Sequence, residues 1–185
     1  MSFRHQIANK LAITSLVLLL AIFGFSDSII SVSAQAKPVN FSLRSLGGGT
    51  VTSSSLSGKV VVLAIGGKND PLDRSLLPQL QKLIDRYQDK PVAVVWVSGD
   101  SERAGARNYA SDQDIRSFVS QEKFTGTVAR DPDGALIRSL GANQLPTIAI
   151  IDKRGNLNTP LIVGFDPDSQ ATLVDISSRV DKLLA

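Results

Sequence analysis

The sequence of 185 residues contains no cysteine and only one histidine, His5. A chain without cysteine can form no disulfide and offers no thiolate nucleophile. Zinc sites built from cysteine and histidine are excluded for the same reason. If His5 belongs to a segment that is removed, Ser-His and Cys-His catalysis also lack a required side chain. The absences therefore exclude thiol chemistry, zinc chemistry and histidine-dependent nucleophilic catalysis.

A strong charge of either sign is also missing. The formal net charge is +3, and lysine and arginine are scattered among acidic and polar residues without forming a basic stripe. Nucleic-acid-binding surfaces usually concentrate basic residues on one face. We therefore expect no nucleic-acid partner. The length corresponds to a single domain.

The N-terminus has the pattern of an export signal. Arg4 and Lys10 precede an uncharged, mostly apolar stretch at residues 11–25, and a small-x-small sequence ends at Ala36. This order is typical of a signal peptide. The sequence therefore predicts a signal peptide over residues 1–36, cleaved after Ala36.

An uncleaved membrane anchor is the alternative for the same segment. A spanning helix needs about 20 apolar residues, whereas Asp27 interrupts this stretch early. We expect membrane contact only if the signal is retained. The predicted location is the periplasm or a thylakoid lumen, with secretion or membrane anchoring as alternatives.

Residues 37–185 alternate between strand-like and helix-like patterns, without an internal repeat. An unbroken apolar run at 60–65 is typical of a central strand that is covered on both faces. In chain order, the patterns predict a hairpin over 40–46 and 50–56, strands at 60–65 and 91–98, a helix starting at Asp70-Pro71 between them, a polar loop at 99–110, a helix opened by Ser111, a short strand at 125–129, a short helix at 135–140, a hairpin of 148–151 with 157–163, and a last helix starting at Asp166.

Two long segments carry a family resemblance. Residues 41–65, FSLRSLGGGTVTSSSLSGKVVVLAI, and residues 131–157, DPDGALIRSLGANQLPTIAIIDKRGNL, resemble TlpA-type and peroxiredoxin-like (AhpC-TSA) redoxins of the thioredoxin-like superfamily. The resemblance covers roughly residues 38–184. It implies an α/β fold of the thioredoxin-like kind, with three α/β/α layers, a mixed central sheet and an N-terminal β-hairpin, formed by a domain over 37–185.

The resemblance also implies a Trp-Cys-x-x-Cys sequence ahead of the first long helix. A gapless comparison places Asp70 and Asp73 on the two cysteine positions and Asn69 on the tryptophan position. Carboxylates form no disulfide, and dithiol exchange and peroxide reduction both require sulfur. We therefore expect no thiol redox activity.

Asp70 and Asp73 allow two interpretations. A side-chain oxygen at the N-cap accepts from free backbone N–H groups, and a further carboxylate in the first turn suits the positive end of the helix dipole. We favour this capping role. Alternatively, the two form a carboxylate pair for hydrolysis or for binding of a divalent cation. On the favoured interpretation we expect no catalytic residue, no metal and no cofactor.

Leu72, Leu145 and Pro146 are the candidate binding residues. In the redoxins that this chain resembles, the proline at this position is normally cis, and the backbone before it pairs with an extended substrate chain. A purely architectural role for Pro146 is the alternative. We predict an exported binding or scaffolding module that takes a polypeptide partner in a groove beside these residues and Asp70. The other class of function is an enzyme, either a redoxin that uses a partner's cysteine or a carboxylate-dependent hydrolase.

Two further features flank the first long helix: a pair of glycines before it and a tryptophan on the predicted strand after it. Gly66 and Gly67 predict a close approach of the backbone to another group. Trp96 lies in a continuous apolar run and is interpreted as a core residue.

Overall fold

The apolar runs of the sequence form the centre of a seven-stranded mixed sheet. The computed structural model describes residues 37–167 and 169–185, so the predicted signal peptide lies outside the described residues. The strands are β1 (Ser42–Ser45), β2 (Thr50–Thr52), β3 (Val60–Gly66), β4 (Val92–Ser98), β5 (Thr127–Arg130), β6 (Thr147–Ile151) and β7 (Leu157–Val163). Their order is β2-β1-β5-β4-β3-β6-β7. Strands β3, β4 and β5 run parallel, whereas β1 and β6 run antiparallel to their neighbours in this central group.

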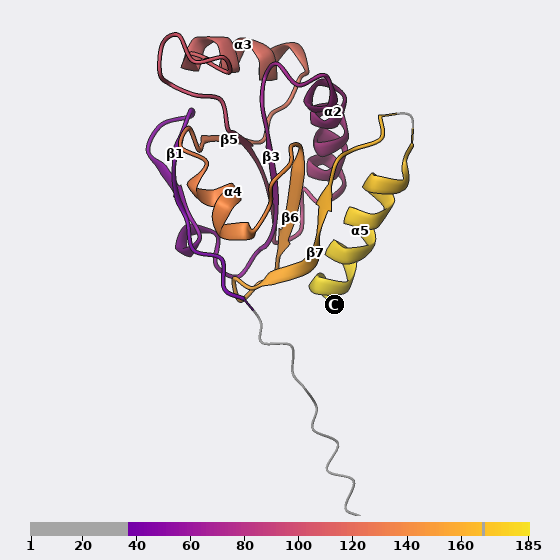
Figure 1. Cartoon of the computed structure of the whole chain (residues 1–185). Coiled ribbons are helices and arrows are strands. Elements are labelled where there is room, and N and C mark those ends of the chain that lie inside the picture. Colours follow the sequence, from indigo (N-terminus) through magenta and orange to yellow (C-terminus); the bar gives the residue numbers. More distant parts are fainter. Residues whose placement is uncertain (1–36, 168) are drawn as a thin grey trace, which may run out of the picture. The chain divides into compact units, whose positions relative to one another are not determined.

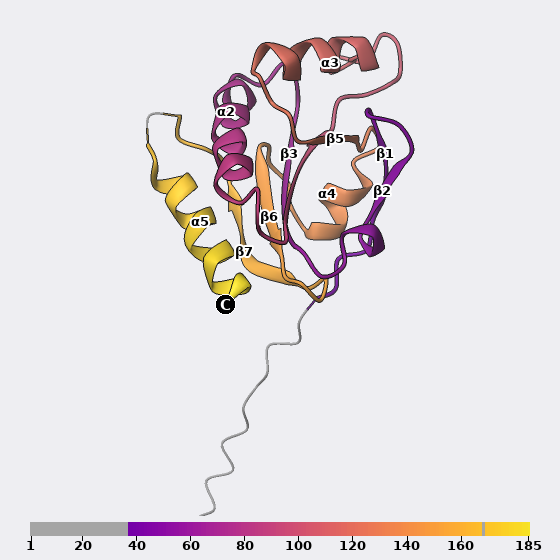
Figure 2. The ribbon, with the colours of Figure 1, turned by 180° about the vertical axis from the view of Figure 1, so that it is seen from behind.

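Helices cover both faces of the sheet. They are α2 (Pro71–Arg86), α3 (Asp112–Gln121), α4 (Ala135–Leu140) and α5 (Ala171–Leu184). The buried side chains of α2, α3 and α5 form one core cluster with the sheet, and α4 forms a second cluster with the opposite face and the β1–β2 hairpin. Figures 1 and 2 show α2 and α5 on the side of the sheet away from α4. The predicted three-layer architecture with an N-terminal hairpin is confirmed.

Strand β3 is apolar throughout because both of its faces are covered. Its seven residues are all buried. Val60, Val62 and Ala64 belong to the cluster with α2, α3 and α5. Val61 and Leu63 belong to the cluster with α4. Because successive side chains of a strand point to opposite faces, a strand covered on both faces needs apolar residues at every position.

Several predicted boundaries shift, and local side-chain hydrogen bonds explain the two largest shifts. The second hairpin strand ends at Thr52 instead of continuing to residue 56, because Ser55 donates to the Thr52 carbonyl and a 3-10 helix (Ser54–Leu56) follows. The last helix begins at Ala171 instead of Asp166, and its first N–H donates to the Ser169 hydroxyl. Serine and threonine side chains compete in this way with strand pairing and helix extension.

The outer edge of β7 is covered by an arginine from α5. Arg179 donates from Nη2 to the carbonyls of Asn158 and Pro160, at 2.7 and 2.6 Å, and from Nε to the Asn158 amide oxygen at 2.8 Å. Carbonyls on an edge strand otherwise remain open to pairing with another chain. Within the described residues, no helix is both long and apolar enough to cross a membrane.

Candidate functional site

The candidate site lies where three strands meet at one end of the sheet. Gly66, at the end of β3, pairs with Ser98 at the end of β4. On the other side of β3, Ile65 pairs with Thr147, the first residue of β6. The loops after β3 and β4 and the segment before β6 therefore share one edge, which is the usual location of sites in open α/β sheets.

Asp70 caps the helix that follows β3. Its backbone is extended, and its Oδ1 accepts from the Leu72 N–H at 2.9 Å. Pro71 occupies the first helical position, where its missing N–H is not needed. The capping role predicted for Asp70 is confirmed.

Asp73 stands in the first turn of α2 but is fully buried, with 0% of its surface exposed. Its Oδ1 accepts from the indole Nε1 of Trp96 at 2.8 Å, and its Oδ2 accepts from the Gly67 N–H at 3.0 Å. Burial raises the pKa of Asp73 to about 6, although the two hydrogen bonds partly oppose this shift. The capping interpretation does not describe this residue, because its carboxylate faces the loop and the core.

Gly66 makes room for this carboxylate. A Cβ at position 66 would lie 1.9 Å from Asp73 Oδ1, which no side chain tolerates. The close backbone approach predicted for Gly66 is thus a contact with Asp73. Trp96 is a core residue as predicted, and Asp73 satisfies its buried N–H, which otherwise would lose a hydrogen bond.

A second buried carboxylate, Asp100, lies on the other side of the same loop. Its Oδ2 accepts from the Lys68 N–H and from the Ser98 hydroxyl, both at 2.9 Å. A Cβ on Gly67 would lie 3.2 Å from its Oδ1. The sequence analysis missed Asp100, although a signal existed: it follows a buried parallel strand, and such positions meet at the functional edge of the sheet.

Arg130 is the other buried residue that the sequence analysis missed. Its Nη2 donates to the carbonyls of Asp100 and Ala110, at 3.0 and 3.1 Å, and its Nη1 pairs with Asp112 at 3.0 Å. These bonds tie the two ends of the loop after β4 to the end of β5. Arg130 therefore fixes the position of Asp100 beside the glycine loop.

The segment before β6 contains Leu145 and Pro146, joined by a cis peptide bond. Pro146 is buried and its carbonyl accepts from Gly164, whereas Leu145 is half-buried. The Leu145 Cδ1 lies 3.9 Å from where a Cβ of Gly99 would stand. Among the described residues, neither the N–H nor the C=O of Leu145 has a hydrogen-bond partner.

The structure brings the predicted site residues to one end of the sheet without joining them into one network. Asp70, Leu72 and Asp73 belong to the first turn of α2, and Leu145 and Pro146 lie beside the end of β3. In the part of the chain that the structure describes, no hydrogen bond connects these two groups. Leu72 is half-buried, and Asp73 lies beneath the loop rather than on the surface.

This geometry does not suit a carboxylate-dependent hydrolase. Such an enzyme needs two carboxyl groups that both reach the substrate, and the Asp73 carboxyl is inaccessible. The described residues contain no group of three or more histidine, cysteine or acidic residues that could hold a metal ion. The arrangement instead provides a rigid loop, held by two carboxylates, next to an unpaired stretch of backbone at Leu145.

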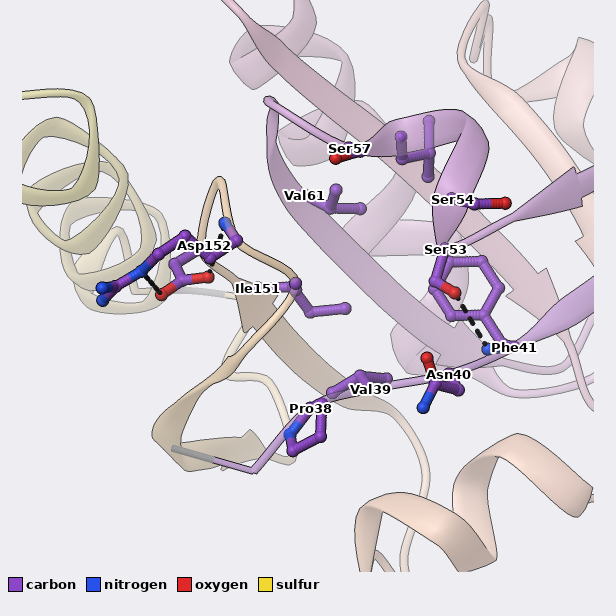
Figure 3. Close-up of a pocket in the computed structure, with 13 residues that line it drawn as sticks. Pro38, Val39, Asn40, Phe41, Ser53, Ser54, Ser57, Val61, Ile151 and Asp152 are labelled. Carbon is purple, nitrogen blue, oxygen red and sulfur yellow. Dashed lines mark hydrogen bonds and ion pairs between the residues drawn. The ribbon is translucent and has the colours of Figure 1, made fainter. Parts of the chain in front are cut away.

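A separate pocket of about 210 Å³ lies at the opposite end of the sheet, where Val61 pairs with Ile151 (Figure 3). Its wall includes the chain that enters the domain at Pro38 and Val39 and the hydroxyl groups of the turn after β2. None of the residues proposed above lines it.

The sequence is similar to known proteins of one family. The model of the AhpC/TSA family matches residues 33–159. The thiol-disulfide oxidoreductase ResA of Bacillus thuringiensis subsp. konkukian (strain 97-27) is 27% identical over 118 residues, which are 64% of this chain and 63% of ResA. The alignment thus spans slightly less than two thirds of that relative. ResA of Bacillus anthracis is 27% identical over 123 residues, 66% of each chain.

Solved structures share the fold. A structure from Chlorobium tepidum, assigned to the thiol:disulfide interchange protein DsbE, is 26% identical, with a TM-score of 0.68 over 81% of this chain and 97% of that one. The exposed lipoprotein thioredoxin Etrx1 of Streptococcus pneumoniae strain TIGR4 is 26% identical, with a TM-score of 0.61 over 78% and 99%. Together with the family match, these similarities confirm the resemblance: the chain is a thioredoxin-like protein that belongs to the AhpC/TSA family and has no cysteine.

Proposed function

We propose that this protein is a redox-inactive redoxin that binds an extended segment of a partner polypeptide outside the cytosol. The observation that carries the proposal is the unpaired backbone of Leu145, next to the position where the thiols of the family would lie. A partner chain can pair with that N–H and C=O as an added strand does. Binding then needs no covalent capture, which suits a chain without cysteine.

The side chains around this backbone are suited to an apolar contact. Leu145 and Leu72 are both half-buried, so each retains surface that a partner can cover. Pro146 is buried and fixed by the hydrogen bond from Gly164, which keeps the backbone of Leu145 in place. An ordered backbone lowers the entropy that binding must overcome.

The extracytoplasmic location rests on the N-terminal pattern of residues 1–36. It also agrees with the description of the similar protein Etrx1 as an exposed lipoprotein. N-terminal sequencing of the protein isolated from its native host tests this part. A chain that starts at Lys37 supports cleavage, whereas a chain that starts at Met1 contradicts it.

The binding test uses a reduced and carboxymethylated model protein, which is permanently unfolded and has no free thiol. We expect the purified protein to bind this probe and to show amide shifts at Leu145 and Gly99 in NMR spectra. Leu145→Glu places a charge in the apolar contact and should weaken binding by about tenfold, the loss typical of a central interface residue. Val174→Glu is the matched control, because Val174 is 63% exposed on α5. Equal binding by the two variants, or no binding by the wild type, contradicts the proposal.

A further inference from the structure

The loop after β3 is held by two buried carboxylates, one on each side. Gly67 donates to Asp73 and Lys68 donates to Asp100, so two successive backbone N–H groups are bound by acids from different elements. Among the described residues, no lysine or arginine forms an ion pair with either acid. Asp73 is buried with no cation beside it, and burial favours the protonated form of a carboxyl group.

Asp73 accepts both of its hydrogen bonds, so protonation of its carboxylate disturbs them. The indole Nε1 of Trp96 and the backbone N–H of Gly67 can only donate, and each uses a different carboxylate oxygen. A neutral carboxyl group carries a hydrogen on one oxygen, which makes that oxygen a donor and a much weaker acceptor. Protonation of Asp73 therefore weakens one of the two hydrogen bonds enough for it to open.

The surroundings decide which bond is lost. Trp96 is fully buried in the middle of the sheet and packs against Phe118, with ring centroids 5.7 Å apart, so its indole cannot move away. Gly67 lies in a half-exposed loop. The carboxyl group itself has no room to shift toward the strand, because it already contacts Gly66. The Gly67 N–H is the partner that is released.

The loop is next to the surface that the proposed function uses. The Gly66 carbonyl accepts from the Gly99 N–H at 2.8 Å, and Gly99 is in turn the neighbour of the Leu145 side chain. Gly67 is thus linked to the side chain of Leu145 through Gly66 and Gly99.

We propose that Asp73 is an acid-sensitive latch: as a carboxylate it holds the loop after β3 beside Leu145, and as a carboxylic acid it releases Gly67 and loosens the binding surface. The inference rests on the proposed function for its effect on the partner, but the latch itself does not. Its consequence is that the protein holds a polypeptide at neutral pH and releases it in acid.

Other charged groups around Asp73 set the pH at which it acts. Asp70 on its own helix and Asp100 after β4 are both negative, and both favour the protonated form of Asp73. Lys68 in the loop directs its ammonium to Asn69. Arg74 on α2 pairs with Glu122 beyond α3. No titratable side chain from β6 contributes to the pKa of Asp73 among the causes of its shift.

The latch is tested without any ligand by titrating the purified protein. Trp96 is the only tryptophan, so its emission reports on Asp73 directly. We expect one transition near pH 6 in the emission, in the Gly67 amide shift and in the carboxyl carbon shift of ¹³C-labelled aspartate. The carboxyl signal needs no variant, so the test holds even if a substitution prevents folding. A wild type whose Asp73 carboxyl does not titrate between pH 4.5 and 7.5 overturns the latch.

Two variants separate Asp73 from its neighbour. Asp73→Asn keeps the shape but offers one acceptor only, so it should show the released state at every pH and no transition. Asp70→Asn should keep the transition and move it to lower pH, because a negative neighbour is removed. A transition that persists in Asp73→Asn assigns it to another group and overturns the proposal.

The effect on binding is measured with the same carboxymethylated probe at pH 7.5 and pH 5.0. We expect affinity to fall about tenfold in acid for the wild type, as loss of a hydrogen bond to a charged group allows, and to stay constant and weak for Asp73→Asn. Equal affinity of the wild type at both pH values overturns the coupling. Absence of binding at both pH values, with the emission transition present, instead overturns the proposed function.

Discussion

At the scale of single residues, Asp70 and Asp73, which we expect to stand at the family's cysteine positions, have different environments. Asp70 is a helix cap at the protein surface, whereas Asp73 is enclosed between the glycine loop and Trp96. The difference arises because Asp70 is the N-cap, with an extended backbone outside the helix and its carboxylate turned to the Leu72 N–H, whereas Asp73 stands in the first helical turn with its carboxylate against Trp96 and Gly67.

Gly66→Ala should be strongly destabilising. Its Cβ would overlap the Asp73 carboxylate, so either the carboxylate or the strand must move. We expect the free energy of unfolding to fall by about 2–4 kcal/mol, from overpacking and a lost hydrogen bond. Urea denaturation measures the change. Gly47→Ala is the control, since its Cβ would lie 3.6 Å from the nearest atom.

A double-variant cycle identifies the cause of that loss. In the Asp73→Ala background the obstructing carboxylate is absent, so Gly66→Ala should be tolerated far better than in the wild type. If Gly66→Ala has the same effect in both backgrounds, the overlap with Asp73 is not the reason.

The pH dependence of stability follows from the raised pKa of Asp73. In the unfolded chain an aspartate titrates near its ordinary value of 3.8, and burial raises the pKa of Asp73 to about 6 in the folded protein. The folded state thus binds the proton on Asp73 more tightly than the unfolded state does. The resulting stabilisation of the fold is complete below pH 3.8 and is lost as pH rises through 6. At pH 7 the free energy of unfolding is then lower by up to about 3 kcal/mol than at a pH below 3.8, as far as Asp73 contributes.

Comparison with Asp73→Asn isolates this effect. Other acids act in the opposite direction. A hydrogen bond from Arg44 lowers the pKa of Asp112, so protonation of Asp112 at low pH destabilises the folded state. We expect the stability of the wild type relative to Asp73→Asn to increase between pH 7 and pH 4.5. Urea denaturation of both proteins at several pH values gives the difference, and a difference that does not change with pH contradicts the raised pKa.

The sequence predicts the role of Asp70 but not the burial of Asp73, and the reason is physical. A cap depends on the residues next to it, such as Pro71, so it is visible in the sequence. The burial of Asp73 depends on Gly66 and Trp96, which approach it only after β3 and β4 have paired. Asp100 was missed for the same reason.

At the scale of elements, the stability of helix α2 depends on its first turn. Pro78 lies inside the helix and removes one internal N–H donor, which leaves the Arg74 carbonyl without its usual partner. The cap at Asp70 satisfies one of the free N–H groups at the start. The helix that carries the site is thus stabilised at its start as well as by its apolar face.

Asp70→Ala should lower the free energy of unfolding by about 1 kcal/mol, the usual effect of losing a side-chain cap. Asp70→Asn keeps an acceptor oxygen and should have a much smaller effect. Thermal or urea denaturation distinguishes the two. Equal loss in both variants would assign the effect to the charge of Asp70 rather than to its hydrogen bond.

Most elements were predictable because their signals are local. The last short helix before β6 spans Ala135–Leu140, the range that the sequence predicts, and Gly141 ends it in a left-handed conformation. Ser111 and Asp114 form the predicted capping box of α3. The errors fall at Thr52 and at the start of α5, where hydroxyl side chains bond to nearby backbone in ways that apolar periodicity does not reveal.

At the scale of the whole molecule, the fold was predictable because apolar runs, turns and their order fix the sheet. The absence of thiol chemistry was predictable as well, because composition alone determines it. The resemblance placed the candidate groove at Leu145 and Pro146, but the sequence did not show that the backbone of Leu145 is unpaired, since that can be recognised only when every neighbouring pairing is known.

Insulin reduction and peroxidase assays should show no activity for the wild type, because the chain has no cysteine thiol to carry electrons. The double variant Asp70→Cys/Asp73→Cys restores the family spacing at a helix N-terminus, where thiolates are stabilised. We expect measurable insulin reduction from this variant. The single variants are the controls and should be inactive. Activity in the wild type contradicts the assignment, and an inactive double variant shows that the loop no longer accepts a disulfide.

The arginine over β7 has a consequence for the protein at high concentration. An edge strand with open carbonyls can pair with a strand of another copy of the chain. Arg179 occupies the carbonyls of Asn158 and Pro160 that such stacking would use. We therefore expect this edge to resist self-association of the protein into ribbons at high concentration.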